Sequence, residues 1–421
     1  MSRKSKDNTF VWSNGWWLED SKAWFICGMS NVLFCIDFNT GQCEKLACIP
    51  ELCECTYRQN PYCIKSGKDI FCIPGFAQNI WIYNLDSRDF KQVRIDKPEG
   101  YQLGDGFWIW RDMLYLVPGN WNKIVEIDMT RKEVITYYTI CEDDSFRKSV
   151  LIDDCVYIVS YAHSRIYQFD LVTKKIELFT FDNFDRRFYT ICFDGKKFWM
   201  SGYHKEVYVW DKRNDSLATI NNLPMNYEMY ALADRADRIV DYAAGGYKYP
   251  IFGNSVVVGD YVWFIPALTD KIMYADKNSD QLYTLEIDDE CETKEKAFLR
   301  ELWAINNYLL EYVRCDRYIG LFSIRSGRVL EIDAQELTYQ WKNYNLRNKH
   351  LFQCGRGRTD QMYCSEENGV YELIYCIKDY QPDQDNSAYK KNVGVQIYNN
   401  ITRLYNFIND TLVAESTVLG H

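Results

Sequence analysis

Two of the four histidines in the chain, His163 and His204, each stand seven residues before an aspartate, and Trp121 stands seven residues before another. A tryptophan ring stacks on the face of a sugar, while histidine and arginine side chains bind its hydroxyl or carboxylate groups. These residue types at one repeated spacing favour a carbohydrate-binding site. We expect its ligand-binding residues to be Trp121, Asn122, His163, Arg165, His204, Lys205, Arg186, Arg187 and Tyr189.

The same residues have a second interpretation, because polar side chains in turns are usually solvated and a shared spacing in adjacent repeats also arises from duplication alone. In the functional interpretation, Arg165 and Lys205 give the site a positive charge on an acidic chain, which suits an anionic or hydroxyl-rich ligand. Trp121 is then expected to be an exposed stacking platform at the rim.

Catalytic signatures are absent from the sequence. Acidic runs such as Glu142-Asp143-Asp144 supply carboxylates, but acid–base catalysis needs two of them at a fixed separation across a cleft. There is no G-x-S-x-G, Walker or dinucleotide-binding motif. The first hypothesis is therefore a non-catalytic binding module for a carbohydrate or glycan precursor. Two alternatives stay open: a carbohydrate-active lyase or hydrolase that uses the histidine-bearing rim, and a protein-interaction scaffold.

The sixteen cysteines do not form a recognisable metal site. Cys48, Cys53, Cys55 and Cys63 are close in sequence, but their gaps do not match the paired C-x2-C spacing of zinc sites. Other cysteines lie inside apolar runs, where cysteine packs as a small hydrophobic residue. We expect reduced thiols, no bound metal and no cofactor.

A repeated phrase in the chain indicates how these residues are positioned. An apolar run, a turn, a second apolar run, a polar residue and another turn recur seven times, and the polar residues are Asp37, Asn84, Asp128, Asp170, Asp211, Asp276 and Ser323. Their spacings are 47, 44, 42, 41, 65 and 47 residues. Strand-type repeats with a period in the low forties are typical of β-propellers, in which each period forms one blade.

Each period divides into four short strands. In the third unit these are residues 106–110, 113–118, 123–128 and 133–138, separated by turns rich in Asp, Asn and Gly. We therefore predict an all-β, seven-bladed propeller. Six or eight blades stay open, because residues 336–364 supply either closing strands or a degenerate eighth unit. In such a blade, the turn between the second and third strands lies on the same face as the links between blades.

The repeating unit resembles the blades of kelch-like and WD-type propellers over residues 10–335. One unit contains the Trp210-Asp211 pair, whereas the only Gly-Gly pair, Gly245-Gly246, lies in an interruption of the repeat. The resemblance implies the propeller architecture and a role as a ligand or partner platform. It transfers no catalytic residues.

Two regions depart from the repeat. The wide fifth interval contains an insertion at about 221–255, in which residues 229–243 have helix-like spacing. After the propeller, which we expect to span residues 1–364, residues 365–421 contain two amphipathic segments. We expect these to form a pair of C-terminal helices packed on the propeller.

Composition limits the class of partner. The formal net charge is −10, which disfavours nucleic-acid binding because that affinity comes from clustered Lys and Arg. No apolar run is long enough to cross a bilayer, and the start of the chain lacks the apolar core of a secretory signal. With reduced thiols expected as well, these features favour a cytoplasmic protein that binds a small molecule, a glycan or a protein partner.

Overall fold

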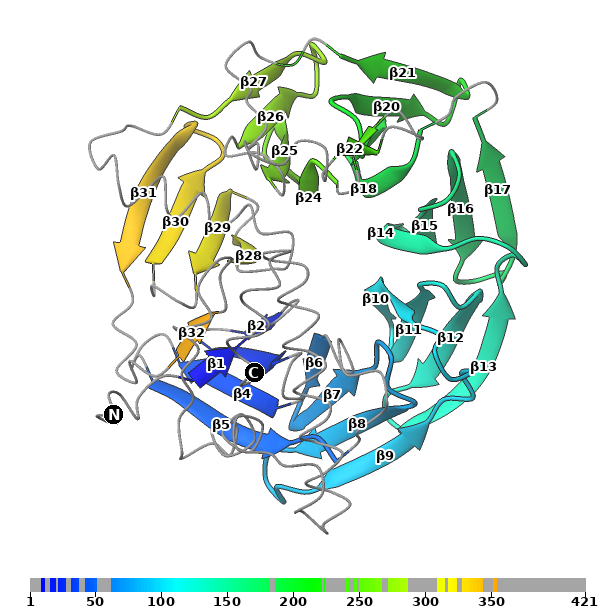
Figure 1. The fold of residues 1–421 in the computed structure, drawn as a ribbon, viewed down its shortest axis with the longest axis vertical. Coiled ribbons are helices and arrows are strands. Elements are labelled where there is room, and N and C mark those ends of the chain that lie inside the picture. Colours follow the sequence, from blue (N-terminus) through cyan, green and yellow to red (C-terminus); the bar gives the residue numbers. More distant parts are fainter. Residues whose placement is uncertain are drawn as a thin grey trace, which may run out of the picture.

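The computed structural model describes residues 9–11, 16–19, 22–27, 32–37, 42–50, 62–181, 186–221, 223, 240–241, 246–247, 250–266, 272–286, 309–314, 317–323, 328–343 and 351–353. Within these ranges, seven four-stranded antiparallel sheets surround a common axis as the blades of a propeller (Figure 1). The prediction of an all-β, seven-bladed propeller is confirmed. The described residues include no helix with the length and apolarity needed to cross a bilayer.

We call the strands of each blade A to D from the axis outward. Blade 1 comprises β2 (Trp16–Glu19), β3 (Lys22–Cys27), β4 (Val32–Asp37) and β5 (Gln42–Cys48). Blade 2 comprises β6 (Tyr62–Ser66), β7 (Asp69–Ile73), β8 (Asn79–Asn84) and β9 (Phe90–Arg94). Blade 3 comprises β10 (Leu103–Trp110), β11 (Met113–Pro118), β12 (Lys123–Asp128) and β13 (Glu133–Thr139). Blades 4 and 5 comprise β14 (Phe146–Ile152), β15 (Cys155–Ser160), β16 (Arg165–Asp170), β17 (Ile176–Thr180); β18 (Phe188–Phe193), β19 (Phe198–Gly202), β20 (Val207–Asp211), β21 (Ser216–Ile220). Blades 6 and 7 comprise β24 (Phe252–Val258), β25 (Tyr261–Pro266), β26 (Met273–Asp276), β27 (Leu282–Thr284); β28 (Leu309–Arg314), β29 (Tyr318–Ser323), β30 (Arg328–Asp333), β31 (Thr338–Asn343).

The hydrophobic core lies between successive blades. Side chains of a strand alternate between the two faces of its sheet, and in a propeller both faces are covered by neighbouring blades. In β11, Leu114 and Leu116 pack into the core shared with blade 2, whereas Tyr115 and Val117 pack into the core shared with blade 4. This double burial explains why the B strands are continuous apolar runs rather than alternating ones.

The repeated aspartate has a structural role at the turn between strands C and D. The Oδ1 atom of Asp128 accepts hydrogen bonds from the backbone N–H groups of Thr130 and Arg131 at 2.9 and 2.8 Å. Asp170 binds Val172 and Thr173 in the same way. Short polar side chains of this kind stabilise a turn by replacing backbone hydrogen bonds. The repeated aspartate therefore indicates a hairpin turn and not a functional site.

The seventh unit corrects one sequence assignment. The turn-forming residue at the end of strand C is Asp333, whose Oδ1 atom accepts from the backbone N–H of Gln335 at 3.1 Å. Ser323 instead ends strand B, β29. Strands B and C of this blade both end in a short polar residue before a turn. The sequence pattern therefore assigned the role of the repeated aspartate to the end of strand B, one strand too early. Of residues 336–364, Thr338–Asn343 form the outer strand of blade 7, and no eighth blade appears among the described residues.

Two small sheets accompany the blades. β1 (Thr9–Val11) pairs in parallel with β32 (Leu351–Gln353), which joins the two ends of the propeller sequence. β22 (Val240–Asp241) pairs with β23 (Gly246–Tyr247), so the end of the predicted helix at 229–243 forms part of a hairpin instead. The preceding part of that predicted helix and the predicted C-terminal helices at 365–421 lie outside the described residues.

Lysine side chains from CD turns connect neighbouring blades. Lys174 of blade 4 places its Nζ atom 2.9 Å from Glu126 Oε1 and 2.6 Å from the hydroxyl of Tyr115, both in blade 3. Glu126 also accepts hydrogen bonds from the hydroxyl of Tyr115, at 2.6 Å, and from that of Tyr138. Because Glu126 is only 6% exposed, these three donors stabilise a charge that burial alone would disfavour.

Candidate ligand-binding site

The BC turns and the links between blades lie on one face of the ring, which we call the BC face. Backbone hydrogen bonds connect neighbouring blades on this face. Phe146 N–H, at the start of strand A in blade 4, donates to the carbonyl of Gly119 in the BC turn of blade 3 at 2.7 Å. Ile251 N–H, in the link into blade 6, donates to the carbonyl of Gly202 at the end of strand B in blade 5 at 3.1 Å. Trp121, His163 and His204 lie in the BC turns of blades 3, 4 and 5. Their placement in equivalent turns follows the sequence prediction.

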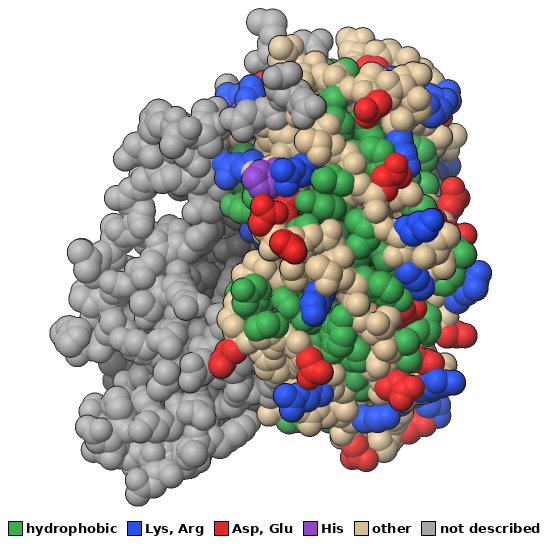
Figure 2. Space-filling model, turned by 90° about the vertical axis from the view of Figure 1, so that its right-hand side faces the viewer, with side chains coloured by type: hydrophobic (Ala, Val, Ile, Leu, Met, Phe, Trp, Pro, Cys, Tyr) green, Lys and Arg blue, Asp and Glu red, His purple; other side chains and the backbone are tan. Residues whose placement is uncertain are grey.

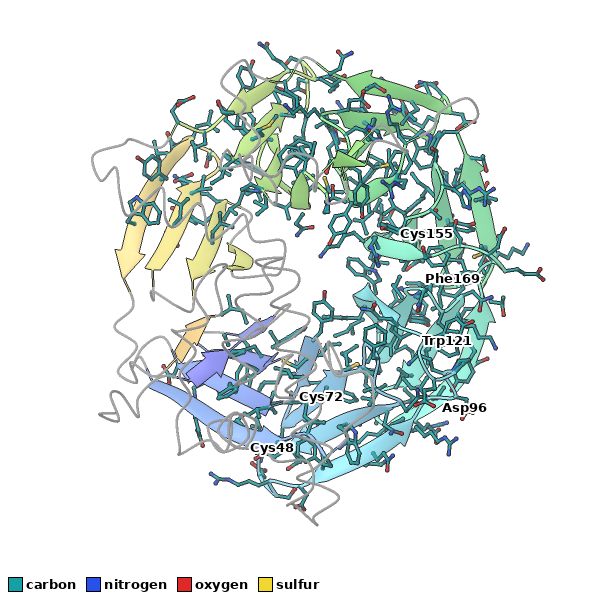
Figure 3. The ribbon with its side chains drawn as sticks, in the orientation of Figure 1. Cys48, Cys72, Asp96, Trp121, Cys155 and Phe169 are labelled. Atoms are coloured by element: carbon teal, nitrogen blue, oxygen red, sulfur yellow. The ribbon has the colours of Figure 1, made fainter. Side chains whose placement is uncertain are left out.

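Trp121 is buried, which corrects the expectation that it stands exposed at the rim. Its side chain is 4% exposed and belongs to the core between blades 2 and 3 (Figure 3). The indole packs edge-on against Tyr137, with ring centroids 5.7 Å apart. The reason is local: the BC turn of blade 3 folds inward, and the backbone N–H of Trp121 reaches the carbonyl of Gln102.

The two histidines differ in exposure. His163 is exposed, whereas His204 is 7% exposed and therefore buried. Lys205 is exposed and Arg165 half-buried, while Asn122 uses its side-chain amide to donate to the carbonyl of Cys141 at 2.6 Å. Figure 2 shows a histidine flanked by basic side chains, with acidic ones beside it, at the surface seen from the right of Figure 1. Trp121, His163 and His204 thus do not form one exposed surface.

The link into blade 5 is held firmly by its neighbours. The hydroxyl of Ser164 donates to the carbonyl of Arg186 at 2.7 Å and accepts from the backbone N–H of the same residue at 3.0 Å. Arg186 Nε donates to Glu206 Oε2 at 2.9 Å, and the hydroxyl of Tyr208 donates to the same oxygen at 3.0 Å. Burial alone raises the pKa of Glu206, but these hydrogen bonds outweigh it and hold that pKa below its usual value. The backbone next to Arg187 is thereby fixed.

An arginine–tyrosine cluster, formed by Arg147, Tyr161, Arg187, Tyr189 and Tyr203, lies between blades 4 and 5 on the BC face. The guanidinium carbon of Arg147 is 4.2 Å from the ring centroid of Tyr161, and that of Arg187 is 4.6 Å from Tyr203. Arg187 is also 5.8 Å from Tyr161, so both cations contact one ring. The ring of Tyr203 meets those of Tyr161 and Tyr189 edge-on at 5.6 and 6.0 Å.

β-Bulges position two members of the cluster. In blade 4, Phe146 pairs with Ser160 and Ser149 with Ile158, so Arg147 and its neighbour stand opposite a single residue. In blade 5, Tyr189 is the extra residue between two adjacent pairs of the β18–β19 ladder. A bulge redirects the side chains of its strand. Both bulges lie at the start of an A strand, the strand nearest the axis in Figure 1.

The cluster is suited to binding rather than to proton transfer. Burial raises the pKa of Tyr203 well above its usual value, although nearby Arg147 partly opposes this effect. Its hydroxyl therefore stays protonated, and because Tyr203 is only 2% exposed its ring supports Arg187 instead of contacting a ligand. An arginine over an aromatic face gains about 0.5–2 kcal/mol, so both guanidinium planes are held in defined orientations. Half-buried, oriented cations beside hydroxyl donors can receive an anion or a hydroxyl-rich ring.

Sequence reasoning anticipated part of this cluster. Arg187 and Tyr189 were among the predicted ligand-binding residues, but Tyr161 and Tyr203 were not. A signal for them exists, since each is the first residue after strand B in its blade, and the two blades are consecutive. Comparing the residues that end each B strand would have found the pair.

Other candidate sites in the described residues are weaker. No three His, Cys, Asp or Glu side chains in the part of the chain that the structure describes are grouped to hold a metal ion. A groove of about 480 Å³ runs along β13 beside the end of β9, on the outer edge of blades 2 and 3. Its charged side chains are engaged in ion pairs, such as Lys132 with Asp69 at 2.6 Å.

Comparisons with known proteins establish the fold alone. No protein-family model and no curated protein matches the chain. A streptogramin B lyase structure is 12% identical with a TM-score of 0.49, and the match covers 76% of this chain and 92% of that one. The computationally designed Ika8 protein is 7% identical with a TM-score of 0.52, covering 83% and 94%. A catalytically inactive virginiamycin B lyase from Staphylococcus aureus with quinupristin is 11% identical with a TM-score of 0.50, covering 77% and 94%. The likenesses to the Ika8 protein and to the virginiamycin B lyase support the β-propeller and assign neither a kelch-like nor a WD-type family.

Proposed function

We propose that the protein is a non-catalytic binding module whose carbohydrate ligand binds at the arginine–tyrosine cluster on the BC face. The observation that carries this proposal is the pair of arginine–tyrosine stacks, Arg147 on Tyr161 and Arg187 on Tyr203, supplied by two adjacent blades. A ligand placed there contacts both blades and lies beside the A strands.

The chemistry of the cluster matches that of a sugar. The half-buried Tyr161 and Tyr189 offer ring carbons for the C–H groups of a pyranose, and their hydroxyls and the guanidinium groups donate to sugar hydroxyls. Tyr203 is only 2% exposed and supports Arg187. The bulges and the clamped link hold these groups in place before binding, which reduces the entropy lost on association. Trp121 is left outside the proposed site because it is buried in the core.

The two alternatives receive less support. A lyase or hydrolase that uses the histidine-bearing rim needs both histidines to reach the substrate, but His204 is 7% exposed. The likeness to lyase structures carries no activity to this chain at such low identity. The scaffold hypothesis rests largely on the insertion and tail, most of which lies outside the described residues.

A thermal-shift screen against mono- and oligosaccharides tests the proposal, because a ligand that binds the native state raises the melting temperature. Calorimetric titration of the best sugar with Tyr161→Ala should show affinity about fivefold weaker or more, equivalent to about 1 kcal/mol. Tyr101→Ala is the control, since Tyr101 is 43% exposed and outside the cluster. A screen without any hit, or a hit whose affinity is the same in wild type and Tyr161→Ala, contradicts the proposal.

A further inference from the structure

We infer that the ligand of the arginine–tyrosine cluster carries a phosphate or carboxylate group, which binds between Arg147 and Arg187. This inference rests on the proposed function and names the chemical class of the ligand. The two arginines come from different blades, one from strand A of blade 4 and the other from the link into blade 5. The guanidinium carbons of both nevertheless lie within 6 Å of the ring centroid of Tyr161, so the two arginines share one tyrosine as a neighbour.

The surroundings of the cluster are less acidic than the chain as a whole. Residues 140–148, 161–165, 181–189 and 203–206 comprise the links, the BC turns and the adjoining strand ends, and they contain six Lys or Arg and six Asp or Glu. The protein as a whole has a formal net charge of −10. Within this region, two of the cations, Arg147 and Arg187, lie against the ring of one tyrosine, Tyr161.

Two of these carboxylates are held by donors outside the cluster. Asp144 accepts from the hydroxyl of Ser160 at 2.6 Å and from that of Tyr167 at 3.1 Å. Glu206 accepts from Arg186 and Tyr208, as described above. Both of these acidic groups therefore stabilise the frame of the site.

The geometry of the cations selects an oxyanion over a neutral sugar. A guanidinium is a planar fork of N–H donors that matches the oxygens of phosphate and carboxylate in paired hydrogen bonds. The tyrosine rings beneath Arg147 and Arg187 fix the planes of these forks. A sugar that carries one acidic group satisfies both parts of the cluster, with its ring on tyrosine and its oxyanion on arginine.

The test compares glucose, phosphorylated glucose, glucuronate and inorganic phosphate as probes in calorimetric titrations at low and high NaCl. At least one acidic sugar should bind about tenfold more tightly than glucose, and high salt should weaken only the acidic probes. Which acidic sugar binds better separates phosphate from carboxylate as the natural group. Arg147→Gln should remove the preference for the acidic sugar, because it lowers the affinity for that sugar more than the affinity for glucose.

Arg94→Gln is the matched control, because it removes one positive charge from an exposed arginine at the outer edge of blade 2. It should leave the preference unchanged, and a melting temperature near that of wild type confirms that each variant is folded. If glucose binds as tightly as its acidic forms, the inference is overturned and the proposed function stands. If neither these probes nor the neutral oligosaccharides bind, both fail. Retention of the acidic preference in Arg147→Gln also overturns the inference.

Discussion

Gly202 and Arg187 are in direct backbone contact: a Cβ atom at position 202 would lie 1.9 Å from the carbonyl oxygen of Arg187. Gly202 ends strand B of blade 5 and pairs with Phe188, the first residue of strand A. The link that carries Arg187 can approach the sheet this closely only because residue 202 has no side chain. One glycine thus helps to set the position of a cation of the proposed site.

Replacing Gly202 with alanine should shift the link and weaken ligand binding about tenfold, although no binding side chain is removed. The same clash should lower the free energy of unfolding by about 1–3 kcal/mol. Gly104→Ala provides the comparison, because its Cβ would lie 2.3 Å from the carbonyl oxygen of Pro118 in blade 3. It should destabilise the fold to a similar degree and leave affinity unchanged. Wild-type affinity in Gly202→Ala, measured by titration calorimetry, would show that the contact does not position the site.

Trp121→Ala should destabilise the protein by about 3–5 kcal/mol, the usual cost of truncating a buried tryptophan. The indole is 4% exposed and fills the core between blades 2 and 3. Ile135→Ala, on the exposed outer strand of blade 3, should change stability by no more than about 0.5 kcal/mol. Urea unfolding of both variants measures the difference. Equal, small effects would mean that Trp121 is not a core residue.

The propeller could be predicted because the residue that recurs in the sequence makes a local hydrogen bond at a turn. In blades 2 to 7 the aspartate or asparagine at the end of strand C binds the turn that follows it, so similar hydrogen bonds recur with similar residues along the chain. The seventh unit was misassigned because Ser323 and Asp333 both end strands before turns, and sequence alone does not show which strand is the third.

The site could be predicted only in part. Trp121 and His163 have the same offset from the repeated aspartate, yet the first is buried and the second exposed. The offset fixes a place in the turn but not the path of the turn, which depends on its hydrogen bonds. The N–H of Trp121 binds a carbonyl of the preceding link, whereas that of His163 binds the hydroxyl of Ser160 in its own blade.

Acid should weaken the contact between blades 3 and 4. Burial alone raises the pKa of Glu126, but hydrogen bonds from Tyr115, Tyr138 and Lys174 outweigh it and lower that pKa from its ordinary value of 4.5. Glu126 therefore binds a proton more readily in the unfolded chain than in the folded protein. The stabilisation of the fold by the Glu126 carboxylate is complete above pH 4.5 and is lost as the pH falls through the lowered folded-state pKa.

Glu126→Gln should cost about 1–3 kcal/mol of unfolding free energy at neutral pH. Below pH 4.5, the difference between wild type and Glu126→Gln in urea unfolding should narrow, because the wild-type carboxylate becomes protonated. A difference that widens as the pH falls would contradict a lowered pKa for Glu126.

The cysteines should be free and, in the native protein, slow to react. The cysteines whose side chains the structure describes are all free, and burial raises the pKa of Cys63 and of Cys192 to about 12. A thiol reagent acts on the thiolate, so native protein at mildly alkaline pH should react slowly at both positions. Denatured protein prepared without reductant should titrate close to sixteen thiols. A count well below sixteen would indicate disulfides or a bound metal.

The central claim is that the ligand binds at the arginine–tyrosine cluster and not at the exposed histidine of the neighbouring turn. The most direct test is the dissociation constant of the best ligand from the thermal-shift screen, measured by calorimetry with Arg187→Gln and with His163→Ala. We expect Arg187→Gln to weaken binding about tenfold or more through the loss of a charge-assisted contact, and His163→Ala to bind as wild type. Full affinity in Arg187→Gln together with lost affinity in His163→Ala would contradict the central claim.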